Sequence, residues 1–254
     1  MGRLFAHLFS EAGYPVSIGD DQDGPVNWEK HAQNDVVILA VPLGAVKQVV
    51  RHLGPFTKPD GLVIDISSLK QAPVEAMMQY CQGEVIGCHP LFGPSVESLD
   101  RQTIFLSSVR STRWIEWLRS FFEEQGARLV DIDPEEHDRL MATVQSLRHL
   151  VLICFGRSLM KLKFDLATNL PISGEWFPLL VEMMNRQFQQ PAELYTDMAL
   201  ENPWFSNVAD IFYEQVEELI QEFRSVDRSD LIHITNETAS YFSSVISKDN
   251  RSKP

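Results

Sequence analysis

The fold of this chain is decided by the stretch Asp35–Pro42, DVVILAVP. An almost unbroken apolar run of this kind is typical of a strand that is buried on both faces of a parallel sheet. The stretch Gly61–Ile66, GLVIDI, repeats the pattern, and Glu84–Cys88, EVIGC, repeats it again. A shorter strand is expected at Pro15–Gly19, PVSIG. The first part of the chain is therefore expected to form a sheet of buried strands.

Helical patterns lie beside these strands, at Leu4–Ala12, Leu43–Leu53 and Pro73–Tyr80. The alternation of strand and helix at this spacing indicates βαβ units, and hence a doubly wound, parallel α/β sheet. Two further strands, Thr103–Ser108 and Ala127–Ile132, are expected around a helix at Thr112–Gln125. In such a sheet, ligands bind at the carboxyl ends of the strands.

The character of the sequence changes at Asp133. Asp133 and Pro134 form a good helix start, with a capping side chain followed by a proline at the first helical position. Only helical patterns follow, at Glu135–Leu162, Pro178–Gln189, Ala192–Leu200, Trp204–Arg224 and Ser229–Ser247. The chain is therefore predicted to contain an α/β domain at 1–133, a helical domain at 134–247 and a polar tail at 248–254.

The predicted helix at Glu135–Leu162 is unusually long, and its middle, Leu147–Phe155, is apolar on nearly all sides. A helix of this kind is buried, and in a chain of 254 residues this indicates a subunit interface. A homodimer through the helical domain is therefore expected. His137 follows two acidic residues at the start of this helix, and we interpret it as structural.

Charge and cysteine content exclude several classes of partner. A net charge of −13 argues against nucleic acid, which attracts a basic surface, and an anionic substrate would need a local cationic pocket. The three cysteines, Cys81, Cys88 and Cys154, lack CxxC spacing and are expected to be reduced thiols of a cytoplasmic protein, without a disulfide or a bound metal. The sequence contains neither a membrane-length apolar run nor a signal peptide, so no membrane partner is expected.

The first residues fit the end of a dinucleotide-binding glycine loop. Such a unit reads strand, G-x-G-x-x-G and helix, with an acidic residue about 20 positions further on. Gly2 would be the third glycine, which allows close helix–strand packing, and Asp20 would bind the ribose hydroxyls and favour NAD over NADP. Val41 and Pro42, at the end of a strand, are the other cofactor candidates. The first strand and the first two glycines do not occur in the sequence, and an ordinary amphipathic helix followed by a strand would give the same pattern.

The stretch Cys88–Pro94, CHPLFGP, carries the most chemical information. Pro90 and Pro94 restrict the backbone around them, so His89 is expected to be held rigidly at the end of a buried strand. A histidine ring exchanges a proton near neutral pH, and a rigid one in this place is a natural general base. A loop histidine that only packs or caps is the alternative.

Six ordered motifs resemble the prephenate dehydrogenase family, over essentially the whole chain. They are MGRLF at 1–5, SSLK at 67–70, HPLFGP at 89–94, EHD at 136–138, VQSLRH at 144–149, and NRQF at 185–188 continuing to ELY at 193–195. The pattern is most similar to the branch that is usually fused to a chorismate mutase domain. These 254 residues contain no such domain.

The resemblance implies a fold, an activity and roles for particular residues. The family combines a Rossmann domain with a helical dimerisation domain, and it uses NAD to convert prephenate in tyrosine biosynthesis. By this resemblance, His89 is the catalytic histidine and Ser68 is the serine beside it. Arg186 takes the place of the arginine that binds a prephenate carboxylate, and His149 takes that of an auxiliary histidine.

Three of these residues also have structural interpretations. Ser67 and Ser68 both fit a helix N-cap, so the choice between them is open by one residue. His149 lies on an apolar helix, where a satisfied core histidine is common. Arg186 fits a surface ion pair with Glu182, one turn earlier, which would contribute little.

Three functions are compatible with the sequence. The first is NAD-dependent oxidative decarboxylation of prephenate to 4-hydroxyphenylpyruvate, with neutral His89 as the base. The second is the same reaction on 4-amino-4-deoxyprephenate, because His89 and Ser68 would serve an amine as well as a hydroxyl. The third is a truncated, non-catalytic homologue, which the incomplete glycine loop supports and the full set of catalytic motifs opposes. A start assigned too late in the gene would also explain the incomplete loop.

Overall fold

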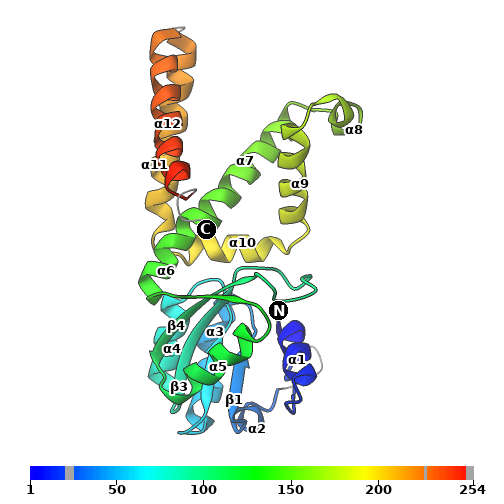
Figure 1. Cartoon of the computed structure of the whole chain (residues 1–254), viewed down its shortest axis with the longest axis vertical. Helices are drawn as coiled ribbons and strands as arrows, with labels where there is room; N and C mark the ends of the chain where they lie inside the picture. The colour runs from blue at the N-terminus through cyan, green and yellow to red at the C-terminus, as the bar shows by residue number, and fades with distance from the viewer. Residues whose placement is uncertain (21–25, 226–227, 250–254) are drawn as a thin grey trace. The chain divides into compact units, whose positions relative to one another are not determined.

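Figure 1 shows the computed structural model, which describes residues 1–20, 26–225 and 228–249. The chain forms two compact units, one from Met1 to Phe205 and one from Ser206 onward. The first unit contains a five-stranded sheet and most of the helices. The second contains α12 (Arg228–Asp249) and all of α11 (Phe205–Ser225) except its first residue.

The strands of the sheet lie in the order β1-β2-β3-β4-β5. Their bounds are Val36–Leu39, Leu62–Asp65, Glu84–Pro90, Thr103–Arg110 and Arg128–Asp131. β1, β2 and β3 are parallel to one another, and β4 and β5 form a second parallel pair. Each strand overlaps a run that the sequence predicts to be a strand. The predicted α/β sheet is therefore confirmed.

One neighbouring pair, β3 and β4, is antiparallel, so the sheet is not wholly parallel as the sequence suggested. The two strands are joined by residues 91–102, which contain no helix. A parallel neighbour requires a crossover, usually a helix, that returns the chain to the opposite end of the sheet. Without such a helix the chain re-enters the sheet at the same end, and β4 runs back along β3.

Helices cover both faces of the sheet: α1 and α5 pack on one face, and α2, α3 and α4 pack on the other. Their bounds are Gly2–Glu11, Arg113–Glu123, Trp28–Ala32, Val46–Leu53 and Gln71–Tyr80, respectively. Successive residues of a strand point to opposite faces. In β2, Leu62 and Ile64 accordingly face α1 and α5, whereas Val63 faces α3 and α4.

The strand predicted at Pro15–Gly19 does not form, because residues 15–20 lie in neither a strand nor a helix. Its apolar residues are not buried: Val16 and Ile18 are 43% and 62% exposed. Alternating apolar residues specify a strand only where one face is buried and a neighbouring strand supplies hydrogen bonds. The prediction for this segment was therefore wrong.

The long helix predicted from Asp133 begins as expected. The carboxylate of Asp133 accepts a hydrogen bond of 2.8 Å from the backbone N–H of Glu135. The run is not uniform, however. It consists of α6 (Pro134–Met141), a π-helical segment η4 (Ala142–Leu147) and α7 (Arg148–Lys161). Short π-helical segments occur frequently at functional sites.

The first unit continues with α8 (Leu166–Asn169), α9 (Trp176–Phe188) and α10 (Ala192–Leu200). α7 packs against α9 (Figure 1). α10 packs against both η4 and the short 3-10 helix η2 (Leu43–Ala45) that follows β1. The sequence did not predict α2 and α8, since helices of five and four residues are too short to show a helical period. Among the described residues, no helix combines the length and the apolar character needed to cross a membrane.

Candidate active site

The carboxyl ends of β1, β2 and β3 bring three predicted site segments to one edge of the sheet. The last paired row of these strands contains Leu39, Asp65 and Gly87. Two residues further along each chain segment come Val41, Ser67 and His89. The predicted cofactor segment, the serine pair and the histidine therefore share the edge at which α/β sheets bind ligands.

His89 lies within β3, one residue before the strand ends, and is 3% exposed. Its neighbour Cys88 packs in the core beneath α1 and α5. Because side chains alternate along a strand, His89 points to the opposite face, toward α4 and α6. Pairing with Phe105 of β4 fixes its backbone. The imidazole is therefore held rigidly at the carboxyl edge of the sheet.

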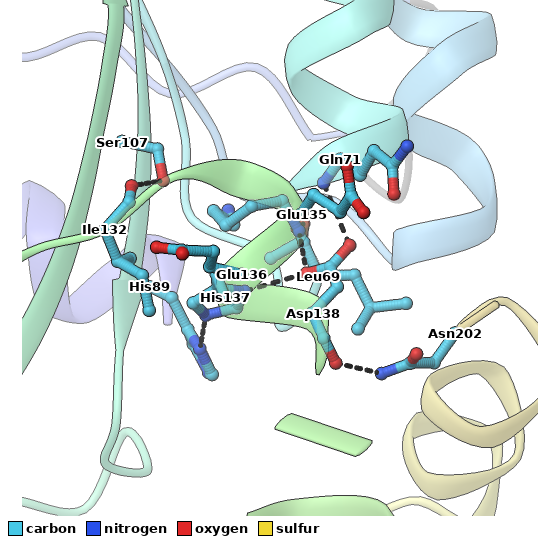
Figure 2. Close-up of polar contacts among 12 residues, drawn as sticks. Leu69, Gln71, His89, Ser107, Ile132, Glu135, Glu136, His137, Asp138 and Asn202 are labelled. Carbon is cyan, nitrogen blue, oxygen red and sulfur yellow. Dashed lines mark hydrogen bonds and ion pairs between the residues drawn. The ribbon is translucent and has the colours of Figure 1, made fainter. Parts of the chain in front are cut away.

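Two residues of α6 extend from His89 in a line of polar contacts (Figure 2). His89 Nδ1 lies 2.8 Å from His137 Nε2, and His137 Nδ1 lies 2.7 Å from Asp138 Oδ1. The carboxylate of Asp138 also accepts hydrogen bonds from the backbone N–H groups of Lys70, at 2.7 Å, and Gln71, at 2.9 Å. The line therefore connects β3 and α6 to the start of α4.

The two histidines of this line are neutral at pH 7. Burial lowers the pKa of His89 well below its usual value, and His137 and Lys70 lower it further. Burial also lowers the pKa of His137, although the hydrogen bond to Asp138 acts in the opposite direction. Desolvation has this effect because imidazolium is the charged form of the ring. A neutral His89 has a lone pair available and can act as a general base.

A buried ion pair shapes the loop after β2. Lys70 Nζ contacts the carboxylate of Asp65 and donates a hydrogen bond of 2.9 Å to the carbonyl of Cys88. Both charged side chains are 0% exposed. Asp65 also accepts from the backbone N–H of Ser67 at 3.1 Å and from its hydroxyl at 3.0 Å. The hydroxyl of Ser67 is therefore hydrogen-bonded within the loop, and the role of Ser68 beside a ligand stays a prediction.

Two further polar contacts lie along the helical run, and one of them involves His89. Gln145 Nε2, in η4, is 3.4 Å from His89 Nε2, and His149 Nε2 is 2.7 Å from Arg148 Nη2. Burial and the charge of Arg148 lower the pKa of His149 to about 4. Gln145 Oε1 and His149 Nδ1 are buried without a hydrogen-bond partner among the described residues. Gln187 Oε1 and Trp204 Nε1 are unpaired in the same way. Buried polar atoms are nearly always paired, so Gln145 Oε1 and His149 Nδ1 are candidates for contact with a polar ligand.

Arg186 lies on α9, where its side chain is 77% exposed and its Nη2 is 2.5 Å from Glu182 Oε1. The surface ion pair that the sequence allowed is therefore present. The next residue, Gln187, is buried, and its Nε2 lies 3.4 Å from the carbonyl of His149. Within the described residues, neither a hydrogen bond nor an ion pair joins Arg186 to His89. The role of Arg186 in substrate binding stays a prediction.

The cofactor candidates lie at the start of α1 and beyond the end of β1. A Cβ atom on Gly2 would be 2.9 Å from the Cβ of Ala40, so only glycine allows α1 to begin this close to the strand. Val41 and Pro42 continue directly from this contact. Asp20 is half-buried at the end of the first described segment. A close helix–strand approach is the feature that the third glycine of a dinucleotide loop provides.

Sequence reasoning missed two residues that contact His89. His137 was interpreted as structural, and Gln145 was not singled out. A signal for both was present, because they are eight residues apart in one predicted helix and eight residues are close to two full turns. His137 and Gln145 would therefore lie on the same face of this predicted helix.

The fold is that of solved prephenate dehydrogenases. A crystal structure of prephenate dehydrogenase from Aquifex aeolicus, in complex with hydroxyphenyl propionate and NAD+, matches with a TM-score of 0.75. The match covers 96% of this chain and 94% of that chain, at 18% sequence identity. At this identity the likeness concerns the fold alone.

Curated relatives carry related names. A probable arogenate/prephenate dehydrogenase of Methanocaldococcus jannaschii is 30% identical over 96% of this chain and 59% of its own length. A T-protein of Haemophilus influenzae is 31% identical over 95% and 64%, respectively. A 4-amino-4-deoxyprephenate dehydrogenase of Streptomyces pristinaespiralis is 24% identical over 80% and 74%. The chain therefore spans about three fifths of the length of the first two relatives.

Two family models match consecutive parts of the chain. The nucleotide-binding domain of prephenate dehydrogenase matches residues 7–131, and the dimerization domain of prephenate dehydrogenase matches residues 133–237. The two matches meet where the sequence changes to helical patterns. With nearly the whole chain matched, this protein belongs to the prephenate dehydrogenase family.

Proposed function

We propose that this protein catalyses the NAD-dependent oxidative decarboxylation of prephenate to 4-hydroxyphenylpyruvate. The observation that carries this proposal is the state of His89. It is a buried, neutral imidazole at the carboxyl edge of the sheet, and its Nδ1 is in hydrogen-bond contact with His137. Its other nitrogen, Nε2, faces Gln145 and is the atom placed to accept a proton.

The chemistry of prephenate suits such a base. Prephenate carries a hydroxyl at C4 and a carboxylate on the same ring. A base bonded to the hydroxyl strengthens hydride donation from C4, because the C–O bond gains double-bond character as the hydride leaves. The carboxylate then departs as CO2, and the phenolate oxygen takes the proton back as the ring becomes aromatic. In this scheme His89 holds the proton and Ser68 orients the hydroxyl; general-base assistance contributes about 10²–10⁴-fold.

The cofactor in this proposal is NAD, which accepts the hydride when bound. The start of α1, close to Ala40, presents backbone N–H groups that suit a pyrophosphate. Asp20 would bind the ribose hydroxyls, and Val41 and Pro42 would lie against the nicotinamide half. The match to a nucleotide-binding domain and the NAD+ in the Aquifex aeolicus structure support this choice.

Substrate carboxylates need a cationic partner, and Arg186 is our candidate, with His149 beside the substrate. The planar guanidinium of an arginine binds a carboxylate through two hydrogen bonds, which lysine cannot reproduce. Arg186 forms an ion pair with the carboxylate of Glu182, so its guanidinium already binds a carboxylate group in this structure. In this proposal Arg186 exchanges Glu182 for a carboxylate of prephenate.

A second candidate substrate is 4-amino-4-deoxyprephenate, which the named relative from Streptomyces pristinaespiralis favours. The name of the Methanocaldococcus jannaschii relative adds arogenate. A neutral His89 serves an amine and a hydroxyl at C4 alike, so the base does not discriminate among these substrates.

The test is an assay of NADH formation with the three substrates side by side, each with NAD+ and with NADP+. We expect the highest kcat/KM for prephenate with NAD+. We also expect His89→Asn to lower kcat by about 10²–10⁴-fold with little change in KM, because it removes the base and keeps the binding contacts. A folded protein that binds NAD+ in calorimetry and does not oxidise prephenate would overturn the proposal.

We further propose that the protein is a cytoplasmic homodimer. Exposed apolar side chains follow one another along α9, where Trp176, Leu179, Met183 and Phe188 are between 47% and 81% exposed. Large exposed apolar surfaces mark protein interfaces. The match to a dimerization domain supports the same conclusion. Sedimentation analysis of the purified chain at micromolar concentration tests it, and a monomer would contradict it.

A further inference from the structure

The contact between His89 and His137 is part of a fully buried line that ends in a carboxylate. His89, His137 and Asp138 are 3%, 0% and 1% exposed, respectively. Figure 2 shows His137 between the other two, with the chain of Asp138 held in turn by Asn202. The amide of Asn202 donates a hydrogen bond of 2.8 Å to the carbonyl of Asp138. The line is therefore anchored at its far end.

The hydrogen bonds of Asp138 fix the direction of this line. Its Oδ1 and Oδ2 accept hydrogen bonds from the backbone N–H groups of Lys70 and Gln71. A carboxylate has only acceptors, so the atom 2.7 Å from Oδ1, His137 Nδ1, must carry a proton. A neutral imidazole has one N–H, and the lone pair of His137 is therefore on Nε2.

The same reasoning then fixes the tautomer of His89. His137 Nε2 is an acceptor, so His89 Nδ1, 2.8 Å away, is the donor. The lone pair of His89 is consequently on Nε2. This nitrogen is the one that faces the amide of Gln145 in η4, rather than the core. The tautomer that the line imposes is the one that a general base at this site requires.

We propose that His137 and Asp138 are positioning residues, which keep the Nε2 lone pair of His89 directed at the C4 substituent of the substrate and share the proton that His89 accepts. This inference rests on the proposed function for the identity of the substrate. The tautomer of His89 is a property of the protein alone, so that part of the inference is independent of the proposed function.

The proton balance of the proposal is closed within the line. When His89 Nε2 takes the hydroxyl proton, His89 Nδ1 passes its own proton to His137 Nε2. His137 is then the cation, and it lies against the carboxylate of Asp138. When the phenolate forms, both transfers reverse and the proton returns to the product oxygen. A buried imidazolium is costly, and contact with a carboxylate lowers that cost.

Other charged groups oppose or favour this cation. Lys70 disfavours a charge on either ring, while Asp65 and Asp138 favour one on His137. Lys70 and Asp65 are paired with each other, so their effects partly cancel. The negative charge of Asp138, next to His137, is not offset in this way. The position that best tolerates the positive charge is therefore His137 rather than His89.

Three substitutions of His137 distinguish a positioning role of this residue from a purely structural role. Gln at this position has an acceptor oxygen that reaches His89 Nδ1. Asn keeps a donor near Asp138 but is too short to reach His89. Phe keeps a ring at this position and forms a hydrogen bond with neither His89 nor Asp138. His52→Phe, in the exposed part of α3, is the matched control for the loss of a histidine.

The experiment measures kcat, KM for prephenate and the pH profile of kcat/KM for these variants. We expect Phe and Asn at position 137 to lower kcat roughly 10- to 10²-fold with little change in KM, which is less than the loss of the base itself. We expect His137→Gln to recover most of kcat. Rescue by His137→Asn but not by His137→Gln would indicate a structural role and overturn the proposal, and so would an unchanged kcat and pH profile in His137→Phe.

A second measurement does not depend on turnover. Long-range ¹H–¹⁵N spectra distinguish the two neutral tautomers of a histidine, and His89→Asn assigns the signals of His89. We expect the proton of His89 on Nδ1 in the unaltered protein, and a mixture of tautomers in His137→Phe. A proton on Nε2 would overturn the proposal even if prephenate is turned over. The expected tautomer in a protein without prephenate activity would refute only the proposed function.

Discussion

Gly2 and Ala40 lie so close together that a Cβ atom on residue 2 would be 2.9 Å from the Cβ of Ala40. Real Cβ contacts are essentially never this short, so any larger residue must move α1 away from the end of β1. Val41 and Pro42 follow this contact directly. The contact therefore sets the distance between the helix start and the strand end that we propose to hold NAD.

Gly2→Val should weaken NAD binding. We expect an increase in KM for NAD+ with a smaller change in kcat, and a loss of stability of about 1–3 kcal/mol from overpacking. Arg3→Val is the matched control, because it places the same side chain one residue later, where α1 is exposed. Steady-state kinetics with varied NAD+ measures the effect. Equal KM values in the two variants would contradict the assigned role of Gly2.

Lys70→Met should destabilise the protein strongly, because it leaves the fully buried carboxylate of Asp65 without its cation. Removing one partner of a buried ion pair typically costs about 3–5 kcal/mol. The matched control is Lys58→Met, which breaks a surface pair with Asp35 and should cost about 0–1 kcal/mol. Urea unfolding measures both. We would abandon this account of the buried pair if the two variants lost the same stability.

Ser67 and Ser68 should differ in what their loss affects. Ser67→Ala removes the hydroxyl that bonds to Asp65 in the loop, and we expect it to cost about 1 kcal/mol of stability. Ser68→Ala should leave stability unchanged and lower kcat, if this serine orients the substrate hydroxyl. The pair of variants is its own control, measured by thermal unfolding and by NADH formation. A lower kcat in Ser67→Ala alone would assign the role to Ser67 instead.

His149 should make stability depend on acid pH. Burial and Arg148 lower the pKa of His149 to about 4, below the value of about 6.5 for an unfolded histidine. As the pH falls below about 6.5, the unfolded chain binds a proton before the folded one does, so stability is lost down to about pH 4. His149→Gln should show a smaller loss over this range in unfolding measured at several pH values. An equal loss would mean that His149 does not contribute.

Arg186→Ala should raise KM for prephenate without loss of stability. Its ion pair with Glu182 is on the surface and contributes about 0–1 kcal/mol. Hydrogen bonds to a charged group contribute about 1.5–3 kcal/mol, which corresponds to roughly 10- to 150-fold in KM. Glu182→Gln is the control: it releases Arg186 from its partner and should leave KM unchanged or lower it. An unaltered KM in Arg186→Ala would remove Arg186 from the substrate site.

The helices and strands near the site were largely predictable, because the signals are local. The buried run in β1 and the capped start of α6 are properties of a few adjacent residues. The strand predicted at Pro15–Gly19 failed for the complementary reason, since a strand also needs a neighbour and a buried face. The antiparallel direction of β4 likewise depends on how the chain returns to the sheet, which no residue pattern within β4 records.

The sequence by itself determined the α/β sheet and the family, and it singled out His89 as the candidate base, because apolar periodicity and ordered motifs are properties of the order of residues. Only the tertiary structure decided what His89 touches. His137 is 48 residues away in the chain and reaches His89 because α6 packs against α4, which itself packs against β3. Hydrogen bonds require direct contact at about 3 Å, and contacts between distant segments exist only once the chain has folded.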